Sequence, residues 1–232
     1  SAPVTVSIPY TPTAAELADP EHIVVWYIDG SGNVVSVPNG RYDAATGSVT
    51  FFTTHFSNYA VTYVHKTFSD LGSVEWARKA IEVTASKGIT YGTGDGTTFS
   101  PTVNITRADF MALLIKTLGL AAEFTENFDD VKPDAYYYNA VGTAKKLGIA
   151  AGCGNNLFKP TESISRQDMM VLAARVLEKY QSLKTAENSA VLERFSDRKE
   201  IAEYAVQSLA TLIEAGLVEG SDGRLTPSAN VT

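Results

Sequence analysis

The sequence contains little cysteine, little histidine and no long apolar run, and each shortage narrows what the protein can be. Its single cysteine, Cys153, excludes a disulfide within the chain and a metal site made of several cysteines. Its three histidines, His22, His55 and His65, all lie in the first third of the chain, so they cannot serve a site in later segments. No apolar stretch approaches the roughly 20 residues of a membrane-spanning helix. We therefore predict no metal, no cofactor and no membrane insertion.

Basic side chains are also scarce, because 19 lysines and arginines face 26 acidic residues and give a formal charge of −7. Diffuse attraction to nucleic acid or anionic lipid is therefore not expected, and any polyanion has to be held in a local pocket. Motifs for a nucleophilic serine elbow, a phosphate loop or paired catalytic carboxylates are missing as well. We predict a non-catalytic protein and, because no leader opens the sequence at Ser1, a piece of a longer one.

Residues 1–66 have the pattern of antiparallel strands. Valines and isoleucines alternate with polar residues near the start, and the apolar run 23–28 ends at a hairpin signal, Asp29-Gly-Ser-Gly-Asn33. Five or six short strands without a helix predict half of a β-sandwich. Because so small a segment buries little surface alone, we expect it to pack on further strands or on the helical residues after position 66.

From Thr67 onward the pattern changes to helices, and three copies of one repeat appear. Each copy opens with a phenylalanine, at Phe68, Phe128 or Phe195, two residues before an aspartate. A first amphipathic helix comes next and ends at a Gly-Ile or Gly-Leu pair, which is typical of a Schellman ending. Each copy then carries a second glycine, a turn, and a Phe-x-Pro or Leu-x-Pro sequence. The recurrence predicts three structurally equivalent units.

A second, almost wholly apolar helix comes after this loop in the first two copies and is predicted to be buried. Thr106 and Ser165 are its predicted N-caps, each with an aspartate three residues later. The next residue in both copies is an arginine, Arg107 or Arg166, although a cation at a helix N-terminus is unfavourable. Free backbone N–H groups and a guanidinium would suit a carboxylate or phosphate, so we interpret this mismatch as a sign of anion binding.

The third copy reaches Thr232, which aligns with Thr106 and Ser165. Its arginine and second helix are absent from the sequence. We therefore expect an incomplete third repeat, with an apolar gap that a neighbouring chain could fill.

These motifs, in register over residues 68–232, resemble S-layer homology (SLH) domains. The predicted fold class is α+β, with an antiparallel β segment followed by an all-α pseudo-threefold bundle of three repeats, the third incomplete. The expected domains are 1–66, 67–127, 128–190 and 191–232. The resemblance implies a cell-wall anchor of a Gram-positive bacterium, extracellular, that binds a pyruvylated secondary cell-wall polysaccharide in grooves between repeats. The family's signature is Thr-Arg-Ala-Glu, and this sequence departs from it by having Asp109 and Asp168 in place of the glutamate.

The predicted ligand-binding residues combine charge, close backbone approach and an aromatic face. They are Arg107, Arg166, Asp70, Asp130, Asp197, Gly92, Gly152, Gly220 and Trp76. Other roles compete for several of them. The arginines could form structural ion pairs with repeat aspartates or capping acids. The three aspartates are expected mainly to cap the helices after them, as Asp197 with Glu200 suggests. Trp76 is expected in the core or a groove wall rather than stacked on sugar.

Two further hypotheses remain open. One is self-assembly of a surface lattice through contacts between repeats. The other is self-cleavage in the β segment, because His55-Phe56-Ser57 resembles the junction at which some β-domains cut their own chain. In that reaction the Ser57 hydroxyl attacks the preceding carbonyl and His55 assists. The simpler interpretation of Ser57 is the start of a turn before the last strand.

Overall fold

The computed structural model describes residues 4–232, and these residues form two compact units. The first unit runs to Thr102 and includes Lys116–Leu120, whereas the second comprises Val103–Ile115 and Ala121–Thr232. The first unit therefore contains the β segment together with the opening half of the first repeat. Each unit is described by itself.

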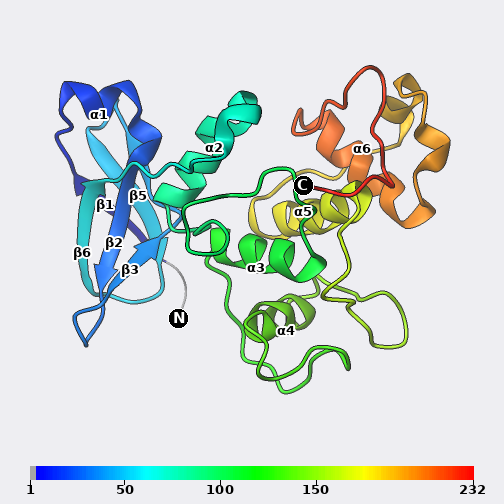
Figure 1. Ribbon diagram of the computed structural model, residues 1–232, viewed down its shortest axis with the longest axis horizontal. Helices are drawn as coiled ribbons and strands as arrows, with labels where there is room; N and C mark the ends of the chain where they lie inside the picture. Colours follow the sequence, from blue (N-terminus) through cyan, green and yellow to red (C-terminus); the bar gives the residue numbers. More distant parts are fainter. Residues whose placement is uncertain (1–3) are drawn as a thin grey trace. The chain divides into compact units, whose positions relative to one another are not determined.

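The β segment consists of six antiparallel strands in two three-stranded sheets, with a short helix α1 (Ala14–Ala18) after the first strand (Figure 1). One sheet has the order β1-β5-β4 and the other β3-β2-β6. The strands are β1 (Val4–Pro9), β2 (Ile23–Ile28), β3 (Val34–Val37), β4 (Arg41–Asp43), β5 (Ser48–Thr53) and β6 (Asn58–Tyr63). The predicted hairpin joins β2 to β3, and the Asp29 carboxylate closes it by accepting hydrogen bonds from the N–H groups of Ser31 and Asn33.

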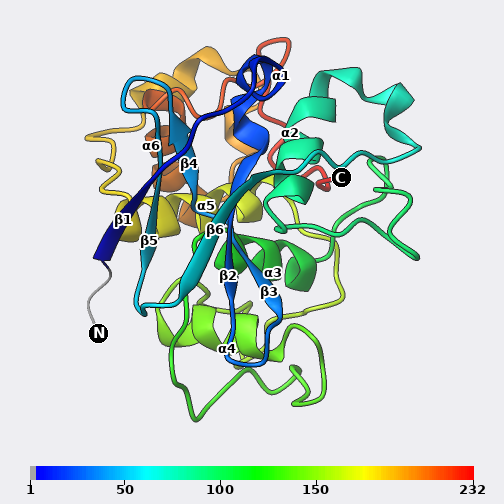
Figure 2. The ribbon, with the colours of Figure 1, turned by 90° about the vertical axis from the view of Figure 1, so that its left-hand side faces the viewer.

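Figure 2 shows the strands of the two sheets, and side chains from both sheets form one apolar core. Ile23 and Val25 from β2 are buried with Val49 and Phe51 from β5, and tyrosines and valines from the other strands surround them. The prediction of half a sandwich is therefore wrong for the described strands. Sequence patterning showed alternation but not that β1, β4 and β5 form a second layer of their own.

The first unit also holds α2 (Glu75–Ser86), the first helix of repeat one. Its inner side packs through Ile81 and Ala85 against Phe68 and Leu71 of the repeat's opening motif. Four apolar residues thus form a small core that is local to the repeat.

The second unit contains α3 (Arg107–Thr117, up to Ile115), α4 (Tyr138–Lys146), α5 (Arg166–Tyr180) and α6 (Val206–Glu214). Three short 3-10 helices, Ala190–Arg194, Arg198–Glu200 and Glu203–Ala205, precede α6. Helices α5 and α6 share an apolar core, to which Met170, Ala174, Leu209 and Leu212 belong. The prediction that the second helix of a repeat is buried is confirmed for α5.

All three first helices end as predicted. The N–H of Ile89 donates to Thr84, that of Ile149 to Ala144 and that of Leu217 to Leu212, at 2.9 Å in each case. The preceding glycines Gly88, Gly148 and Gly216 have φ of 67°, 70° and 69°. These are Schellman endings, in which the left-handed conformation favours glycine.

A closed ring of backbone hydrogen bonds joins the three repeats in the second unit. Ile105 N–H donates to Val231, Val231 N–H to Ile164, and Ile164 N–H to Ile105, over 2.9, 3.0 and 3.1 Å. Each of these residues immediately precedes a predicted cap, Thr106, Ser165 or Thr232. Among residues 4–232, no helix is long and apolar enough to cross a membrane.

Candidate functional site

The N-terminus of α3 is closed by groups from the same unit. Thr106 Oγ1 accepts from Asp109 N–H at 3.1 Å, which confirms the predicted N-cap. The N–H of Arg107 donates to the Glu162 carbonyl at 2.9 Å, and that of Ala108 donates to Pro160 at 3.0 Å. The first three N–H groups of the helix are thus satisfied.

The N-terminus of α5 repeats this arrangement with the loop of repeat three. Ser165 Oγ accepts from Asp168 N–H at 3.2 Å. The N–H groups of Arg166 and Gln167 donate to Ala229 and Pro227, at 2.8 and 2.9 Å. The expectation that free helix N–H groups await an anion is therefore wrong. Loop carbonyls of the next repeat already occupy these donors, and only the arginine side chains remain for such a role.

The Arg107 side chain is buried, with 8% of its surface exposed. Its Nε donates to the Phe158 carbonyl at 2.9 Å, and its Nη1 donates to Asp168 Oδ2 at 2.8 Å. The guanidinium also lies over the Phe158 ring, 5.3 Å from its centre. Arg107 therefore forms an ion pair with the capping acid of the next repeat, which is the structural alternative that the sequence left open.

Arg166 makes the matching backbone contact but not the ion pair. Its Nε donates to the Leu225 carbonyl at 2.9 Å, and its side chain is half-buried. Among the described residues, the guanidinium has no carboxylate partner. Its two terminal amino groups are the donors that remain for a planar anion.

Two tyrosines complete this part of the unit. Tyr136 donates to Asp109 Oδ1, and Tyr204 donates to Asp168 Oδ1 at 2.7 Å. Although both tyrosines are more than half exposed, partial desolvation and the bond to the Asp168 carboxylate raise the pKa of Tyr204 to about 12, and partial desolvation and the bond to Asp109 raise the pKa of Tyr136. Both hydroxyls thus stay protonated at neutral pH and act as donors. Arg107, Asp168 and Tyr204 form a chain of contacts that spans three repeats.

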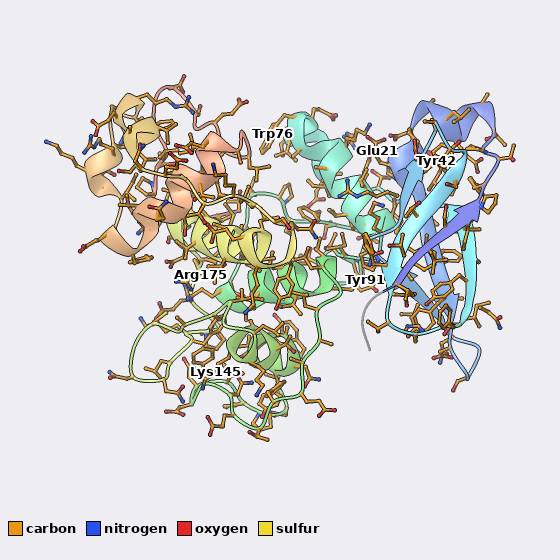
Figure 3. The ribbon with its side chains drawn as sticks, turned by 180° about the vertical axis from the view of Figure 1, so that it is seen from behind. Glu21, Tyr42, Trp76, Tyr91, Lys145 and Arg175 are labelled. Atoms are coloured by element: carbon orange, nitrogen blue, oxygen red, sulfur yellow. The ribbon has the colours of Figure 1, made fainter. Side chains whose placement is uncertain are left out.

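Sequence reasoning had not assigned this role to the tyrosines. Both lie twelve residues before a helix-ending glycine, Gly148 or Gly216, and Trp76 occupies the same place before Gly88. That register was the signal available in the sequence. Trp76 lies on α2 in the first unit with 88% of its surface exposed, so the core interpretation of Trp76 is wrong (Figure 3).

The three repeat aspartates do not cap helices. Neither Asp70 nor Asp197 makes a side-chain cap bond, and the Asp197 carboxylate accepts instead from the N–H groups of Leu225 and Thr226 at 3.0 and 2.7 Å. The Asp70 carboxylate accepts hydrogen bonds from the N–H groups of Phe99 and Ser100, at 2.9 and 2.7 Å. The Asp130 carboxylate accepts from those of Phe158 and Lys159, also at 2.9 and 2.7 Å. The capping prediction is therefore wrong.

Backbone strain explains what these carboxylates do. Ser100, Lys159 and Thr226 have φ of 61°, 59° and 48°, a conformation that residues other than glycine rarely adopt. Each aspartate holds one such residue by its N–H, some 30 positions away in sequence. Asp130 and Asp197 thus fix the loops in which the Phe158 and Leu225 carbonyls accept hydrogen bonds from the two arginines.

The three predicted glycines lie within their own repeats against the opening phenylalanines. Gly92, Gly152 and Gly220 have φ of 77°, 78° and 76°. An added Cβ would lie 2.5 Å from the Phe68 ring at the first and 2.7 Å from the Phe128 ring at the second. Close packing on an aromatic ring therefore requires glycine at these positions. Asp70 and Gly92 belong to the first unit, whereas the later copies belong to the second.

The predicted self-cleavage residues lie in the loop between β5 and β6. His55 Nδ1 is 2.9 Å from Ser57 Oγ, and the Phe56 side chain is 85% exposed. Tyr59 donates to the His55 carbonyl at 2.9 Å. The loop therefore brings the proposed base and nucleophile into hydrogen-bond distance.

Comparison with known proteins decides the family. The family model described as S-layer homology domain matches residues 67–111, 127–170 and 194–232, more than half of the chain. The chain belongs to the S-layer homology domain family. Each matched segment begins one residue before an opening phenylalanine, Phe68, Phe128 or Phe195.

Similar proteins carry the same region as a small part of a large molecule. An amylopullulanase of Thermoanaerobacterium thermosulfurigenes is 36% identical over 92% of this chain and 11% of its own length. An exoglucanase of Acetivibrio thermocellus is 36% identical over 66% of the chain and 14% of its length. A surface-layer 125 kDa protein of Lysinibacillus sphaericus is 29% identical over 68% of this chain and 13% of its own length. The chain thus spans only about an eighth of the curated relatives it matches.

SLH domains are non-catalytic modules that anchor S-layer proteins and surface enzymes to the cell wall. The proteins similar to this chain are cell-surface proteins of Gram-positive bacteria, so the predicted cell-wall location is confirmed.

Proposed function

We propose that this SLH module binds a pyruvylated secondary cell-wall polysaccharide and that Arg166 receives the pyruvate-ketal carboxylate. The observation that carries the proposal is the state of the Arg166 guanidinium. It is half-buried, uses its Nε on the Leu225 carbonyl, and has no carboxylate partner among the described residues. A planar carboxylate matches the free edge of such a guanidinium, and a partly buried pair is worth more than an exposed one.

The surrounding residues support a fixed rather than a mobile arginine. The Asp197 carboxylate holds the Leu225 N–H, and the Leu225 carbonyl holds Arg166. We propose that Asp197 and Gly220 position the guanidinium and do not themselves contact sugar. Asp130 and Gly152 hold the loop under Arg107 in the same way. We assign Arg107 a weaker ligand role, because an incoming carboxylate would have to displace Asp168.

We also propose that the repeats, taken as residues 67–127, 128–190 and 191–232, are arranged about a pseudo-threefold axis. The cyclic bonds among Ile105, Ile164 and Val231 support this arrangement, because each repeat donates once and accepts once. Binding grooves would then lie between neighbouring repeats, as the resemblance implies.

Binding to purified cell-wall sacculi, before and after removal of the secondary polymer, tests the ligand. The full chain should sediment with intact sacculi and remain in solution with stripped ones. Arg166→Ala should abolish most of the binding. Arg175→Ala is the matched control, because Arg175 lies on the same helix and donates to the Ile149 carbonyl at 3.1 Å (Figure 3). Undiminished binding to stripped sacculi would point to peptidoglycan and contradict the proposal.

A second candidate activity, self-cleavage between Phe56 and Ser57, has one specific observation in its favour. His55 Nδ1 lies 2.9 Å from the Ser57 hydroxyl, which it could deprotonate. Ser57 Oγ would attack the Phe56 carbonyl carbon, the peptide nitrogen would leave as the Ser57 amine, and water would hydrolyse the resulting ester. Mass spectrometry of the chain after incubation tests this, with Ser57→Ala as the control. An intact mass after prolonged incubation refutes it.

A further inference from the structure

The first unit contains one cluster of metal-ligating side chains, formed by Asp19, His22 and His65. Among residues 4–232 it is the one group of at least three such side chains, and the three ligand atoms lie within 4.8 Å of one another. The three residues come from two segments. Asp19 and His22 bracket the turn before β2, whereas His65 comes after β6. The sequence predicted no metal site, because the two histidines are 43 positions apart and share no motif.

Hydrogen bonds fix the tautomer of His22, which is fully buried. Its Nδ1 is 2.7 Å from Ser86 Oγ. The single hydroxyl proton of Ser86 is donated to the Glu82 carbonyl at 2.8 Å, so Ser86 Oγ is an acceptor for the imidazole. His22 therefore carries its proton on Nδ1 when it is neutral. Orientation of one ring nitrogen by a hydrogen bond is the usual support for a histidine that binds metal through the other.

The second nitrogen of His22 makes no hydrogen bond, although it is buried. Asp19 Oδ2 lies 3.1 Å away but outside the direction of a hydrogen bond, and Asp19 Oδ1 is likewise without a well-directed partner despite Lys79 at 3.1 Å. The buried Nε2 of His22 thus lies beside a carboxylate without a hydrogen bond to it. A buried, unpaired acceptor beside an anion is costly unless a cation joins them.

His65 provides an accessible third side chain. Its ring centre is 4.7 Å from that of His22, and 45% of its side chain is exposed. Glu82 Oε2 is 3.5 Å from His65 Nε2 and supplies a second carboxylate at the edge of the cluster. Tetrahedral zinc with ligands at roughly 2.0–2.2 Å needs ligand atoms about 3.4 Å apart, so atoms that lie up to 4.8 Å apart have to approach one another by up to about 1.4 Å.

We propose that Asp19, His22 and His65 bind a divalent transition-metal ion of the zinc class, with Glu82 or water completing the coordination. Two imidazoles and one carboxylate suit zinc, whereas calcium and magnesium prefer oxygen ligands alone. The ion would connect the turn before β2, the segment after β6 and, through Ser86, helix α2. Its role is therefore to join the β-sandwich to the first helix of repeat one.

Zinc titration of the untagged full chain, stripped of metal by chelator, tests this site. Competition with a chromophoric chelator should give one zinc per chain, and cobalt should give the visible absorption of a tetrahedral ion. His65→Ala should weaken zinc binding at least ~10-fold. Because His65 is half-exposed, this variant should fold, whereas loss of the buried His22 carries a risk of unfolding.

Asp95→Asn is the matched control, because Asp95 lies in the same unit outside the cluster and its carboxylate accepts hydrogen bonds from Thr97. It should keep the stoichiometry and affinity of the wild type. Zinc should also raise the melting temperature of the wild type but not that of His65→Ala. Absence of a stoichiometric site in the wild type would overturn the proposal, as would an affinity that His65→Ala leaves unchanged.

Discussion

The N-termini of α3 and α5 have the same sequence pattern but different chemical surroundings. Each helix is capped by a hydroxyl, donates two N–H groups to a neighbouring loop, and directs an arginine Nε to a loop carbonyl. Arg107 then meets Asp168 at 2.8 Å, whereas Arg166 meets no carboxylate among the described residues. The repeated motif therefore does not have the same side-chain contacts in the two copies.

Arg107 pairs with Asp168, which lies in the first turn of α5, and Tyr204 holds the other oxygen of that carboxylate. The sequence stops at Thr232, which aligns with Ser165, so it does not contain the residue that would align with Asp168. The Asp109 carboxylate accepts a hydrogen bond from the corresponding tyrosine, Tyr136, but pairs with no arginine among the described residues. Among the described residues Arg107 is held by a carboxylate and Arg166 is not, and substitutions at these positions test whether the two arginines differ in stability and in binding.

The largest expected effect is on polymer binding by Arg166→Ala. Loss of a partly buried charge pair with the ligand should cost about 2–5 kcal/mol of binding free energy. Binding of isolated pyruvylated polymer measured by calorimetry would show this loss. Arg107→Ala should lose less affinity once its lower stability is taken into account. The reverse order would contradict the comparison.

The order should invert for stability. Arg107→Ala leaves Asp168 without its cation and the Phe158 carbonyl without its donor, so the free energy of unfolding should fall by about 3 kcal/mol. Arg166→Ala removes one hydrogen bond and should cost about 1 kcal/mol. Urea unfolding followed by circular dichroism measures both, and equal losses would show that the two arginines are equivalent.

A smaller effect is expected from the tyrosines. Tyr204→Phe removes one donor to the Asp168 carboxylate and should destabilise by about 1–2 kcal/mol. The same loss should appear in Tyr136→Phe, because Asp109 receives its tyrosine in the same way. Combining Tyr204→Phe with Arg107→Ala should give a non-additive loss in urea unfolding, since both act on Asp168. Strict additivity would show that the contacts are independent.

The smallest effect concerns acid and two of the repeat aspartates, Asp70 and Asp197. The hydrogen bond from the Phe99 N–H, together with that from the Ser100 N–H, lowers the pKa of the Asp70 carboxyl group below 3.8. Burial raises the pKa of Asp197, but the hydrogen bonds from the N–H groups of Leu225 and Thr226 outweigh burial, so the pKa is lowered. A carboxyl group whose pKa is lower in the folded state stabilises the folded protein at pH values above its unfolded-state pKa. This stabilisation is lost as the pH falls through the folded-state pKa. Stability measured by urea unfolding should therefore decline below about pH 4, and Asp197→Asn should reduce that slope.

Local features of the fold were predictable from the sequence. The N-caps at Thr106 and Ser165 and the Schellman endings at the three glycines depend on neighbouring residues, and the structure confirms them. The tertiary partners were not predictable. The carboxylate of Asp197 binds a loop 28 residues away, and Arg107 binds an acid 61 residues away. No local pattern distinguishes such a contact from a cap or a ligand site.

The second sheet of the sandwich was missed for a related reason. Alternation shows which face of a strand is buried but not which strands pair, and β1 pairs with β5 although β2, β3 and β4 lie between them in the chain. The exposure of Trp76 was missed because an apolar helix pattern does not distinguish core from binding surface.

The most direct test of the central claim is the arginine side-chain N–H spectrum during titration with a pyruvylated wall sugar. The Arg166 signals, assigned by their loss in Arg166→Lys, should shift in proportion to binding. The Arg107 signals should stay in place, because Asp168 retains that guanidinium. Shifts at Arg107 alone, or binding without a shift at either arginine, would contradict the account.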